Sequence, residues 1–440
     1  MATGRTGGTR NRSVGNEDRL IALGDAIDRR SGVTRKSPRG ARRPAKRGHN
    51  STLRRRVTVV LLVVAVIGTG FAGTSYWLAR SQFEKINNLA CGAACLPTIG
   101  DEPFNILSVG SDSRAGLKGE AAAQAGAVAG QRSDVVKIIH VDPGTQKITV
   151  ISIPRDTMVS LLENTGQYSK FNRINVNYGN GPQLLARTIT ANFGIPINHI
   201  VEVSFGGLAN SVVALGGLYM NFPYRARDAY SGLRIYSPGC QHIDGMSSLA
   251  VARSRHFEWF QNGHWYYDGT SDYGRIHRQD AFLRAMILRA RKEYNPNTIM
   301  NVLGKLPEGI TIDNSFTINN VIALAVKFHN FDPNQMVTYT LPTISPGHVG
   351  NYGSVLVVNQ PATQQLLVNV FGSSLVKPTN PPPNAQLQTP QPPFVPLPTT
   401  TTTVKSTGTT SKHPVTTTTQ PTNDAYYFNP TPCFPSQATK

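Results

Sequence analysis

Two apolar runs joined by a turn stand out in the pattern of hydrophobic and polar positions. Val and Ile dominate Val135–Val141 and Lys147–Ile153. Short apolar runs rich in β-branched residues predict strands, and Asp142-Pro143-Gly144 between them is a strong turn signal. The pattern therefore predicts a hairpin.

Charged residues flank both outer ends of this hairpin. Arg132 and Asp134 precede the first strand, and Arg155 and Asp156 follow the second. Because the outer ends of a hairpin lie together, two arginines and two carboxylates are expected at one edge of a sheet. Burying so many charges without partners is unfavourable. This edge is therefore predicted to be a functional site or an ion-pair network.

Helical and strand-like patterns alternate through the residues that follow. Further strands are expected at 104–109, 200–205, 219–222 and 336–341, and helices at 182–193, 208–215, 245–252, 273–293, 318–328 and 362–370. Residues 115–130 and the aromatic-rich segment 256–267 are expected to be loops. Since no linker-like stretch interrupts the pattern, residues 103–375 are predicted to form one domain of mixed α and β structure.

A run of 23 uncharged residues, 57–79, precedes this domain. At about 1.5 Å per residue it is long enough to cross a bilayer as a helix. Three arginines directly before it place the N-terminus in the cytoplasm and the domain outside the membrane. A cleaved signal peptide is disfavoured because the leading segment is too long and no clear cleavage site follows. A single-pass membrane protein is therefore predicted, with a stalk at 80–102.

Most of the positive charge lies in the leading arm, 1–56. It holds 16 Lys and Arg against 4 Asp and Glu, a net charge of +12 out of +19 for the chain. It lacks apolar periodicity and is predicted to be a disordered cytoplasmic arm that contacts anionic membrane lipid. A nucleic-acid partner is not expected, because the arm has neither aromatic residues nor a helix-turn-helix pattern.

The C-terminal segment, 376–440, is rich in Pro, Thr and Gln. Such a composition offers too little apolar surface to fold, so a disordered tail is predicted. The chain has four cysteines, at 91, 95, 240 and 433. Disulfides are expected outside the cytoplasm, but their pairing cannot be deduced from sequence.

An excess of arginine over carboxylate characterises the candidate site. Asp112 and Asp134, at the ends of two expected strands, suit Mg²⁺, which is commonly held by one or two carboxylates together with substrate phosphates. Arg275, Arg278 and Gln279 share one face of the first turns of a helix, where an anion is favoured. The set is completed by Arg114, Arg132, Arg155, Arg253 and Arg255. The guanidinium groups match phosphate oxygens in bidentate geometry, so a pyrophosphate is the expected ligand.

Five ordered motifs give the chain a resemblance to the LytR-CpsA-Psr family. They are GSDSR at 110–114, RSD at 132–134, SIPRD at 152–156, DG followed by LAVARSR within 244–255, and DYGRIHRQ at 272–279. The resemblance implies an α/β/α sandwich around a mixed sheet, preceded by one transmembrane helix, with an apolar tunnel for a lipid chain. It also implies a transferase that moves a glycopolymer from a polyprenyl-pyrophosphate lipid carrier to peptidoglycan.

The resemblance also suggests roles for individual residues. Asp112 and Asp134 would bind Mg²⁺. Arg132, Arg155 and Asp156 are expected at the reacting phosphate, although Asp156 fits an ion pair with Arg155 at least as well as a general base. Substrate contacts are expected from Arg114, Arg253, Arg255, Arg275, Arg278 and Gln279.

Two alternative functions remain open on the sequence alone. A phosphatase would use the same site with water as the acceptor. A non-enzymatic transcriptional attenuator in the cell envelope is suggested by older descriptions of the family. The polymer itself is not identified by any feature of the sequence.

Overall fold

The computed structural model describes residues 58, 74–98, 100–112, 133–163, 168–292, 302, 304, 309–347, 349–382, 428–434 and 436. All but residue 58 belong to a compact unit spanning 69–440, which is the unit considered below. Within these ranges no helix is long and apolar enough to cross a bilayer. The predicted span 57–79 lies mostly outside the described residues, as do the leading arm and the expected loop 115–130.

A mixed sheet of seven strands forms the centre of the unit. Its order is β1 (Asn87–Leu89), β14 (Ile310–Asp313), β7 (His199–Ser204), β2 (Phe104–Ser111), β3 (Ser133–Asp142), β4 (Lys147–Ile153) and β15 (Val337–Thr340). The predicted hairpin is confirmed as β3 and β4, which pair antiparallel with Val136 opposite Ile153. β2 continues the antiparallel meander, whereas β7 and β15 pair parallel with β2 and β4.

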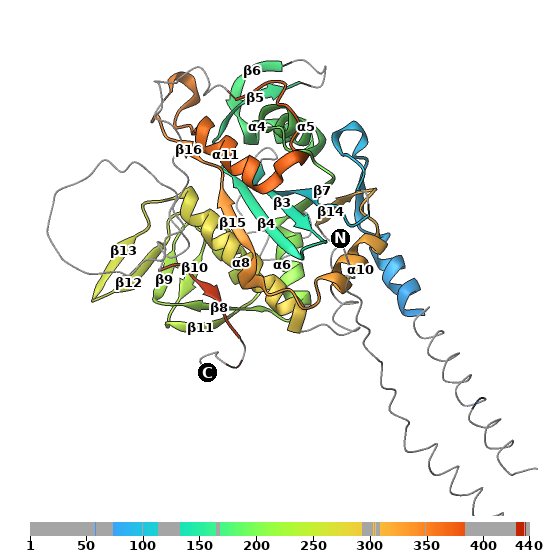
Figure 1. Cartoon of the computed structure of the whole chain (residues 1–440). Coiled ribbons are helices and arrows are strands. Elements are labelled where there is room, and N and C mark those ends of the chain that lie inside the picture. Colours follow the sequence, from blue (N-terminus) through green and yellow to red (C-terminus); the bar gives the residue numbers. More distant parts are fainter. Residues whose placement is uncertain are drawn as a thin grey trace, which may run out of the picture. The chain divides into compact units, whose positions relative to one another are not determined.

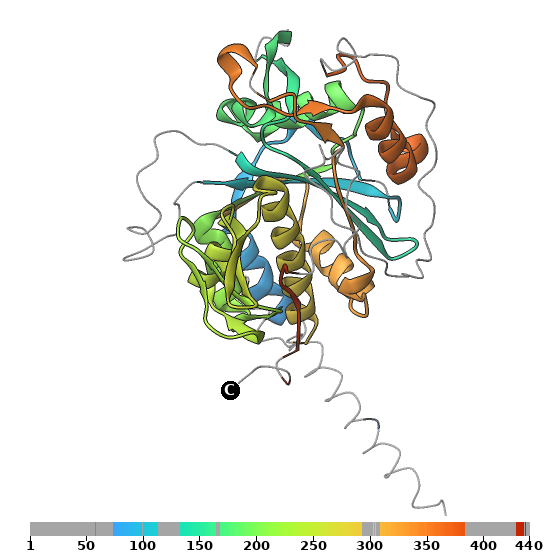
Figure 2. The same cartoon turned by 90° about the vertical axis from the view of Figure 1, so that its left-hand side faces the viewer.

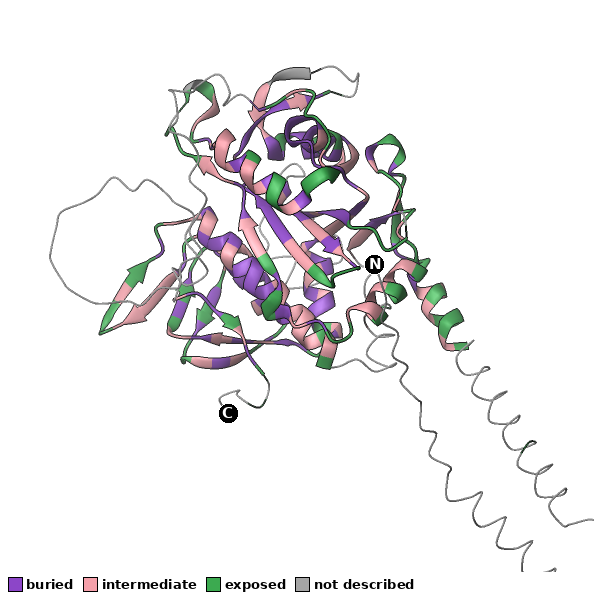
Figure 3. Ribbon diagram, in the orientation of Figure 1, coloured by how far each residue is buried: buried purple, intermediate pink, exposed green. Residues whose placement is uncertain are grey.

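Helices cover both faces of the central sheet (Figures 1 and 2). α5 (Pro182–Phe193) and α11 (Gln360–Phe371) lie on one face, with α4 (Ile174–Asn177) and the β5–β6 pair (Met158–Leu162, Tyr168–Arg173). α8 (Asp272–Lys292) and α10 (Ile318–Lys327) lie on the other. The main core joins buried sheet residues to α5 and α11, and Leu107 of β2, Ile138 of β3 and Ile151 of β4 are fully buried. Figure 3 shows buried and intermediate residues along the central strands. The predicted α/β class is confirmed.

A second group of elements packs against α8. It consists of α6 (Phe205–Ala214), α7 (Gly245–Arg253) and the strands β8 (Leu218–Phe222), β9 (Arg225–Asp228), β10 (Leu233–Ile235), β11 (Gly239–Ile243), β12 (Glu258–Gln261) and β13 (His264–Tyr267). Asp244 caps α7, and its side chain accepts a hydrogen bond from the Ser247 backbone amide at 2.7 Å. A separate small pair consists of β16 (Thr343–Ile344) and β17 (Val357–Val358), which run antiparallel.

The aromatic segment 256–267 is a hairpin and not the expected loop. β12 and β13 pair antiparallel, and β12 also pairs with β9. The turn consists of Asn262 and Gly263, whose φ angles are +51° and +82°. Positive φ at both central positions is the geometry that favours Asn-Gly in two-residue hairpin turns.

The end of the C-terminal tail is folded, contrary to the prediction of disorder for all of 376–440. Thr431–Pro432 form strand β18 on β8, and a disulfide joins Cys433 to Cys240. The Phe428 ring stacks on Trp259 with centroids 4.1 Å apart. Composition alone missed this contact because a disulfide can hold a segment that has little apolar surface of its own.

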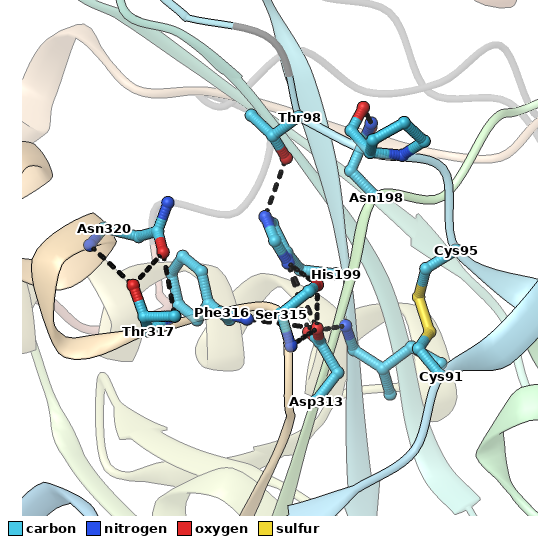
Figure 4. Close-up of polar contacts among 12 residues, drawn as sticks. Cys91, Cys95, Thr98, Asn198, His199, Asp313, Ser315, Phe316, Thr317 and Asn320 are labelled. Carbon is cyan, nitrogen blue, oxygen red and sulfur yellow. Dashed lines mark hydrogen bonds and ion pairs between the residues drawn. A yellow bond between two sulfur atoms is a disulfide. The ribbon is translucent and has the colours of Figure 1, made fainter.

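The predicted stalk is also partly integrated into the fold. Residues 87–89 form strand β1 of the central sheet, and a second disulfide closes the loop from Cys91 to Cys95. A side-chain contact follows this loop and is shown in Figure 4: Thr98 Oγ1 lies 2.8 Å from Nε2 of buried His199. The other ring nitrogen of His199 lies 3.2 Å from the Asp313 carboxylate. The folded domain therefore begins before residue 103.

Candidate active site

The ends of β3 and β4 bring two predicted site residues together. Asp134 is the second residue of β3, and Arg155 follows β4 after Pro154. Because the two strands are antiparallel neighbours, these ends meet. Arg155 Nη1 donates to Asp134 Oδ1 at 2.6 Å, so the sheet edge carries a direct ion pair.

The first turns of α8 supply a second guanidinium to the same carboxylate. Arg275 is buried, and its Nη2 donates to the backbone carbonyl of Asp134 at 2.7 Å. Its Nη1 lies 3.9 Å from Asp134 Oδ2. Asp272, at the start of α8, pairs with Arg275 at 2.7 Å and with Arg255 at 3.4 Å. Helix α8 is thereby tied to the hairpin through charged groups.

These groups line a pocket of about 200 Å³. Its lining consists of Asp134, Arg155, Tyr230, Ser231, Arg253, Arg255, His256 and Arg275. Arg253 comes from the end of α7, where its guanidinium lies over the Phe205 ring at 5.0 Å. Four arginines and one carboxylate among the lining residues make this pocket suited to an anion.

The arginines determine the charge state of Asp134. Burial alone would raise the pKa of the Asp134 carboxyl, but the nearby charges of Arg275 and Arg155 outweigh burial and lower it. Burial lowers the pKa of Arg275 against the opposing charges of Asp272 and Asp134. Arginine stays protonated even so, which leaves the pocket strongly positive at neutral pH.

The predicted site residues are brought together only in part. Asp134, Arg155, Arg253, Arg255 and Arg275 converge on one pocket, although their sequence positions span more than a hundred residues. Arg114 and Arg132 lie outside the described residues. The roles assigned to all of these residues stay predictions.

Asp156 lies between two arginines beside the pocket. Its carboxylate is 3.5 Å from Arg155 Nε and 3.5 Å from Arg173 Nε. It is not among the residues that line the pocket. The ion-pair alternative for Asp156 is thus the one that the geometry supports.

The expectation that Arg278 contacts substrate is wrong. Its side chain is fully buried and donates to Asp268 at 2.8 Å, Asn429 at 2.7 Å and the Ser254 carbonyl at 2.9 Å. These contacts join α8 to the tail and to the end of α7. Arg278 therefore has a structural position behind the pocket, one helical turn from Arg275.

Gln279 also acts from behind the pocket. Its Nε2 donates to the Ala252 carbonyl at 3.0 Å, near the end of α7. It lines a smaller cavity that borders Asp134, Arg155 and Arg275. Through α7 it supports the positions of Arg253 and Arg255.

A buried carboxylate that the sequence did not reveal organises one wall of the pocket. Asp228 accepts hydrogen bonds from the backbone amides of Tyr230, Ser231 and His256 at 2.9, 3.0 and 2.8 Å. It also accepts from Ser254 Oγ at 2.7 Å. The available signal was local: Asp followed by Ala-Tyr-Ser-Gly is typical of a turn in which the Asp side chain caps backbone amides.

The two predicted magnesium ligands occupy neighbouring strand ends. Asp112 directly follows Ser111, which pairs with Ser133, the residue before Asp134. Asp112 lies near enough to Tyr178 to add to the rise in its pKa, after burial and the hydrogen bond to Glu202, and it is not among the residues that line the arginine pocket. Among the described residues no group of three or more His, Cys, Asp or Glu side chains could enclose a metal. Two carboxylates fit an ion that keeps water and phosphate ligands, as Mg²⁺ does.

Comparison with known proteins identifies relatives of this fold and sequence. Residues 78–370 match the LytR_cpsA_psr family. A probable cell wall biosynthesis protein, LcpB of Corynebacterium glutamicum, is 32% identical over 217 residues, which are 49% of this chain and 48% of that protein. The chain thus spans about half the length of that relative.

Two further relatives bear on activity and on fold. A protein named polyisoprenyl-teichoic acid–peptidoglycan teichoic acid transferase TagU, from Enterococcus faecalis, is 27% identical over 60% of this chain and 80% of its own. A solved structure described as a LytR-Csp2A-Psr enzyme from Actinomyces oris superposes with a TM-score of 0.51 at 22% identity. It covers 67% of this chain and 97% of its own, and it supports the fold.

Proposed function

Because the chain belongs to the LytR-CpsA-Psr family, we propose that it transfers a glycopolymer from a polyprenyl-pyrophosphate lipid to peptidoglycan. The observation that carries this proposal is the pocket where Arg155, Arg253, Arg255 and Arg275 surround one carboxylate. A pyrophosphate diester carries two negative charges on adjacent phosphates, and the four guanidinium groups offer paired donors to both.

The reaction expected at this pocket is phosphoryl transfer. A sugar hydroxyl of peptidoglycan attacks the phosphorus that bears the glycopolymer. The bond from that phosphorus to the bridging oxygen breaks, polyprenyl phosphate leaves, and the proton of the attacking hydroxyl passes to solvent or to the departing phosphate. Negative charge grows on the bridging oxygen, where fixed arginines stabilise it without reorganisation.

In this proposal, proton transfer contributes less to the rate than electrostatic stabilisation of the transition state. Asp134 is the carboxylate that lines the pocket, and its lowered pKa makes it a weak base. Its main task would be to orient Arg155 and Arg275 toward the phosphates. Asp156 would hold Arg155 from the other side, together with Arg173.

Magnesium and the membrane complete the proposal. Asp112 and Asp134 would hold Mg²⁺, which would neutralise charge on the phosphate oxygens when bound. Residues 57–79 would anchor the chain in the cell membrane with the catalytic domain outside. This arrangement would place the pocket on the side where lipid-linked polymer meets peptidoglycan.

The test uses the full chain reconstituted in lipid with lipid-linked polymer, peptidoglycan and Mg²⁺. Covalent attachment of polymer to peptidoglycan is expected, and Arg155→Ala should abolish it. Arg234→Ala is a matched control, because Arg234 is exposed on β10 and does not line the pocket. Attachment by Arg155→Ala at the unsubstituted rate would refute the site. Release of polymer phosphate without attachment, or of inorganic phosphate from polyprenyl pyrophosphate that carries no polymer, would favour the phosphatase.

A further inference from the structure

Three aromatic rings form a continuous rim on one side of the arginine pocket. Tyr230 comes from the β9–β10 turn, His256 from the segment between α7 and β12, and Tyr267 from the end of β13. The Tyr230 and His256 rings lie 4.4 Å apart, and the His256 and Tyr267 rings 6.2 Å apart. Both tyrosines are exposed, Tyr230 to 81%. The rim therefore presents exposed aromatic surface to solvent beside the pocket.

The rim is held in place by buried polar contacts. Asp228 binds the backbone amides of Tyr230 and His256, and so joins the two segments that carry these rings. His256 Nδ1 lies 3.1 Å from the Tyr267 hydroxyl, which links the third ring to the other two. Burial would raise the pKa of Asp228, but the hydrogen bonds it accepts outweigh burial and lower it. The exposed rings are thus set on a rigid support.

The tryptophans of the hairpin do not belong to this rim. Trp259 stacks on Phe428, and Trp265 lies under the Arg227 guanidinium at 3.9 Å. Both rings have protein partners that account for them. By contrast, Tyr230 and His256 line the arginine pocket directly.

We propose that Tyr230, His256 and Tyr267 form a subsite that stacks against the sugar ring joined to the pyrophosphate. This inference rests on the proposed function. A ligand whose phosphates occupy the arginines places its next group against Tyr230 and His256, since all six side chains line one pocket. That group is a sugar or a prenyl chain.

The chemistry of the rim favours the sugar. Two hydroxyl groups and an imidazole accompany the ring faces, and Ser231 lies beside them in the lining. A pyranose offers a C–H face for stacking and hydroxyls for such polar groups, whereas a prenyl chain leaves polar groups unpaired. The mixed polar and aromatic surface therefore matches a saccharide and not a hydrocarbon.

Two short probes separate this subsite from the pyrophosphate site. The full chain is titrated with the methyl ester of geranyl pyrophosphate and with geranyl-pyrophosphoryl-N-acetylglucosamine, two pyrophosphate diesters of equal charge that differ only in carrying a methyl group or a sugar. The unsubstituted chain should bind the sugar-bearing probe about tenfold more tightly. Tyr230→Ala should remove most of that ratio, whereas Tyr230→Phe, which keeps the ring and loses only the hydroxyl, should keep most of it. Tyr236→Ala is the matched control, because Tyr236 is 75% exposed and lies outside the pocket.

Each outcome decides between the two assignments. A ratio that survives Tyr230→Ala, or its absence from the unsubstituted chain, would overturn the sugar subsite. Equal weakening of both probes by Tyr230→Ala would also overturn it, because the ring would then act on the shared part of the ligand. Arg155→Ala should weaken both probes. If Arg155→Ala binds both as tightly as the unsubstituted chain, the pyrophosphate assignment fails instead.

Discussion

Arg155 Nη1 and Asp134 Oδ1 lie 2.6 Å apart across the open end of the β3–β4 hairpin. The Arg275 guanidinium, from α8, donates to the backbone carbonyl of Asp134 and lies 3.9 Å from its second carboxylate oxygen. One acidic residue thereby sets the positions of two guanidinium groups that come from different elements.

Substitution of Asp134 by Asn should therefore reduce activity strongly. The amide keeps the size of the side chain but removes the charge that orients Arg155 and Arg275. Polymer attachment should fall about 100-fold or more, as when a fixed electrostatic group is lost from an active site. Attachment is measured with the full chain, and Asp332→Asn, a substitution of an Asp outside the pocket lining, is the control. Activity of Asp134→Asn within a factor of three of the control would contradict this role.

Sequence patterns predicted the hairpin and the pocket's arginines for identifiable reasons. Two Val- and Ile-rich runs around Pro-Gly define the strands, and antiparallel pairing brings their flanking charges together. Arg278 was misassigned because helical spacing shows which residues share a face but not which neighbour that face meets. One turn beyond Arg275, the side chain of Arg278 lies against Asp268 and the tail.

The aromatic hairpin, the folded end of the tail and the role of Asp228 were not predicted, for different reasons. The signal for the aromatic hairpin was present as Asn262-Gly263 between aromatic runs, a strong hairpin dipeptide. The folded end of the tail had no comparable signal, because the pairing of four cysteines is not readable from their spacing. The role of Asp228 depends on the tertiary structure, because its carboxylate binds backbone amides of two segments, at Tyr230 and at His256, that are separated in the sequence.

Replacement of Asp228 by Asn should destabilise the domain at neutral pH and have less effect in acid. The lowered pKa of Asp228 means that the folded state favours the ionised carboxylate. This stabilisation is fully present above the pKa of an unfolded Asp, about 3.9. It is lost as the pH falls through the lower pKa of the folded state. At pH 7 the variant should lose about 2 kcal/mol of unfolding free energy.

Urea unfolding at several pH values checks this dependence. The difference between the unsubstituted chain and Asp228→Asn should be constant from pH 7 to about 5 and should shrink below about pH 4. A difference that stays constant throughout would show that the charge of Asp228 contributes nothing to stability. Asp332→Asn again provides a control.

Loss of the Cys240–Cys433 disulfide should destabilise more than loss of the Cys91–Cys95 disulfide. The first bridge joins residues 193 apart in sequence and the second joins residues 4 apart. In the chain-entropy account, the longer loop contributes about 5 kcal/mol and the shorter about 2 kcal/mol. Paired Cys→Ser variants are compared by melting temperature with and without reductant. If the two paired variants melt at the same temperature, the tail is not an important part of the fold.

The buried pair Lys137 and Asp280 should show strong energetic coupling. Lys137 Nζ lies 2.6 Å from Asp280 Oδ1, and it also donates to Ser152 Oγ at 2.6 Å. The pair connects β3 to α8 beneath the pocket, with both side chains buried. Lys137→Met or Asp280→Ala alone leaves one buried charge without its partner and should cost about 3–5 kcal/mol. The double variant has no unpaired charge, so it should be no less stable than either single variant.

Urea unfolding of the four proteins gives the coupling energy directly. Additive losses would mean that the two charges do not stabilise each other, and that another contact holds α8 against the hairpin.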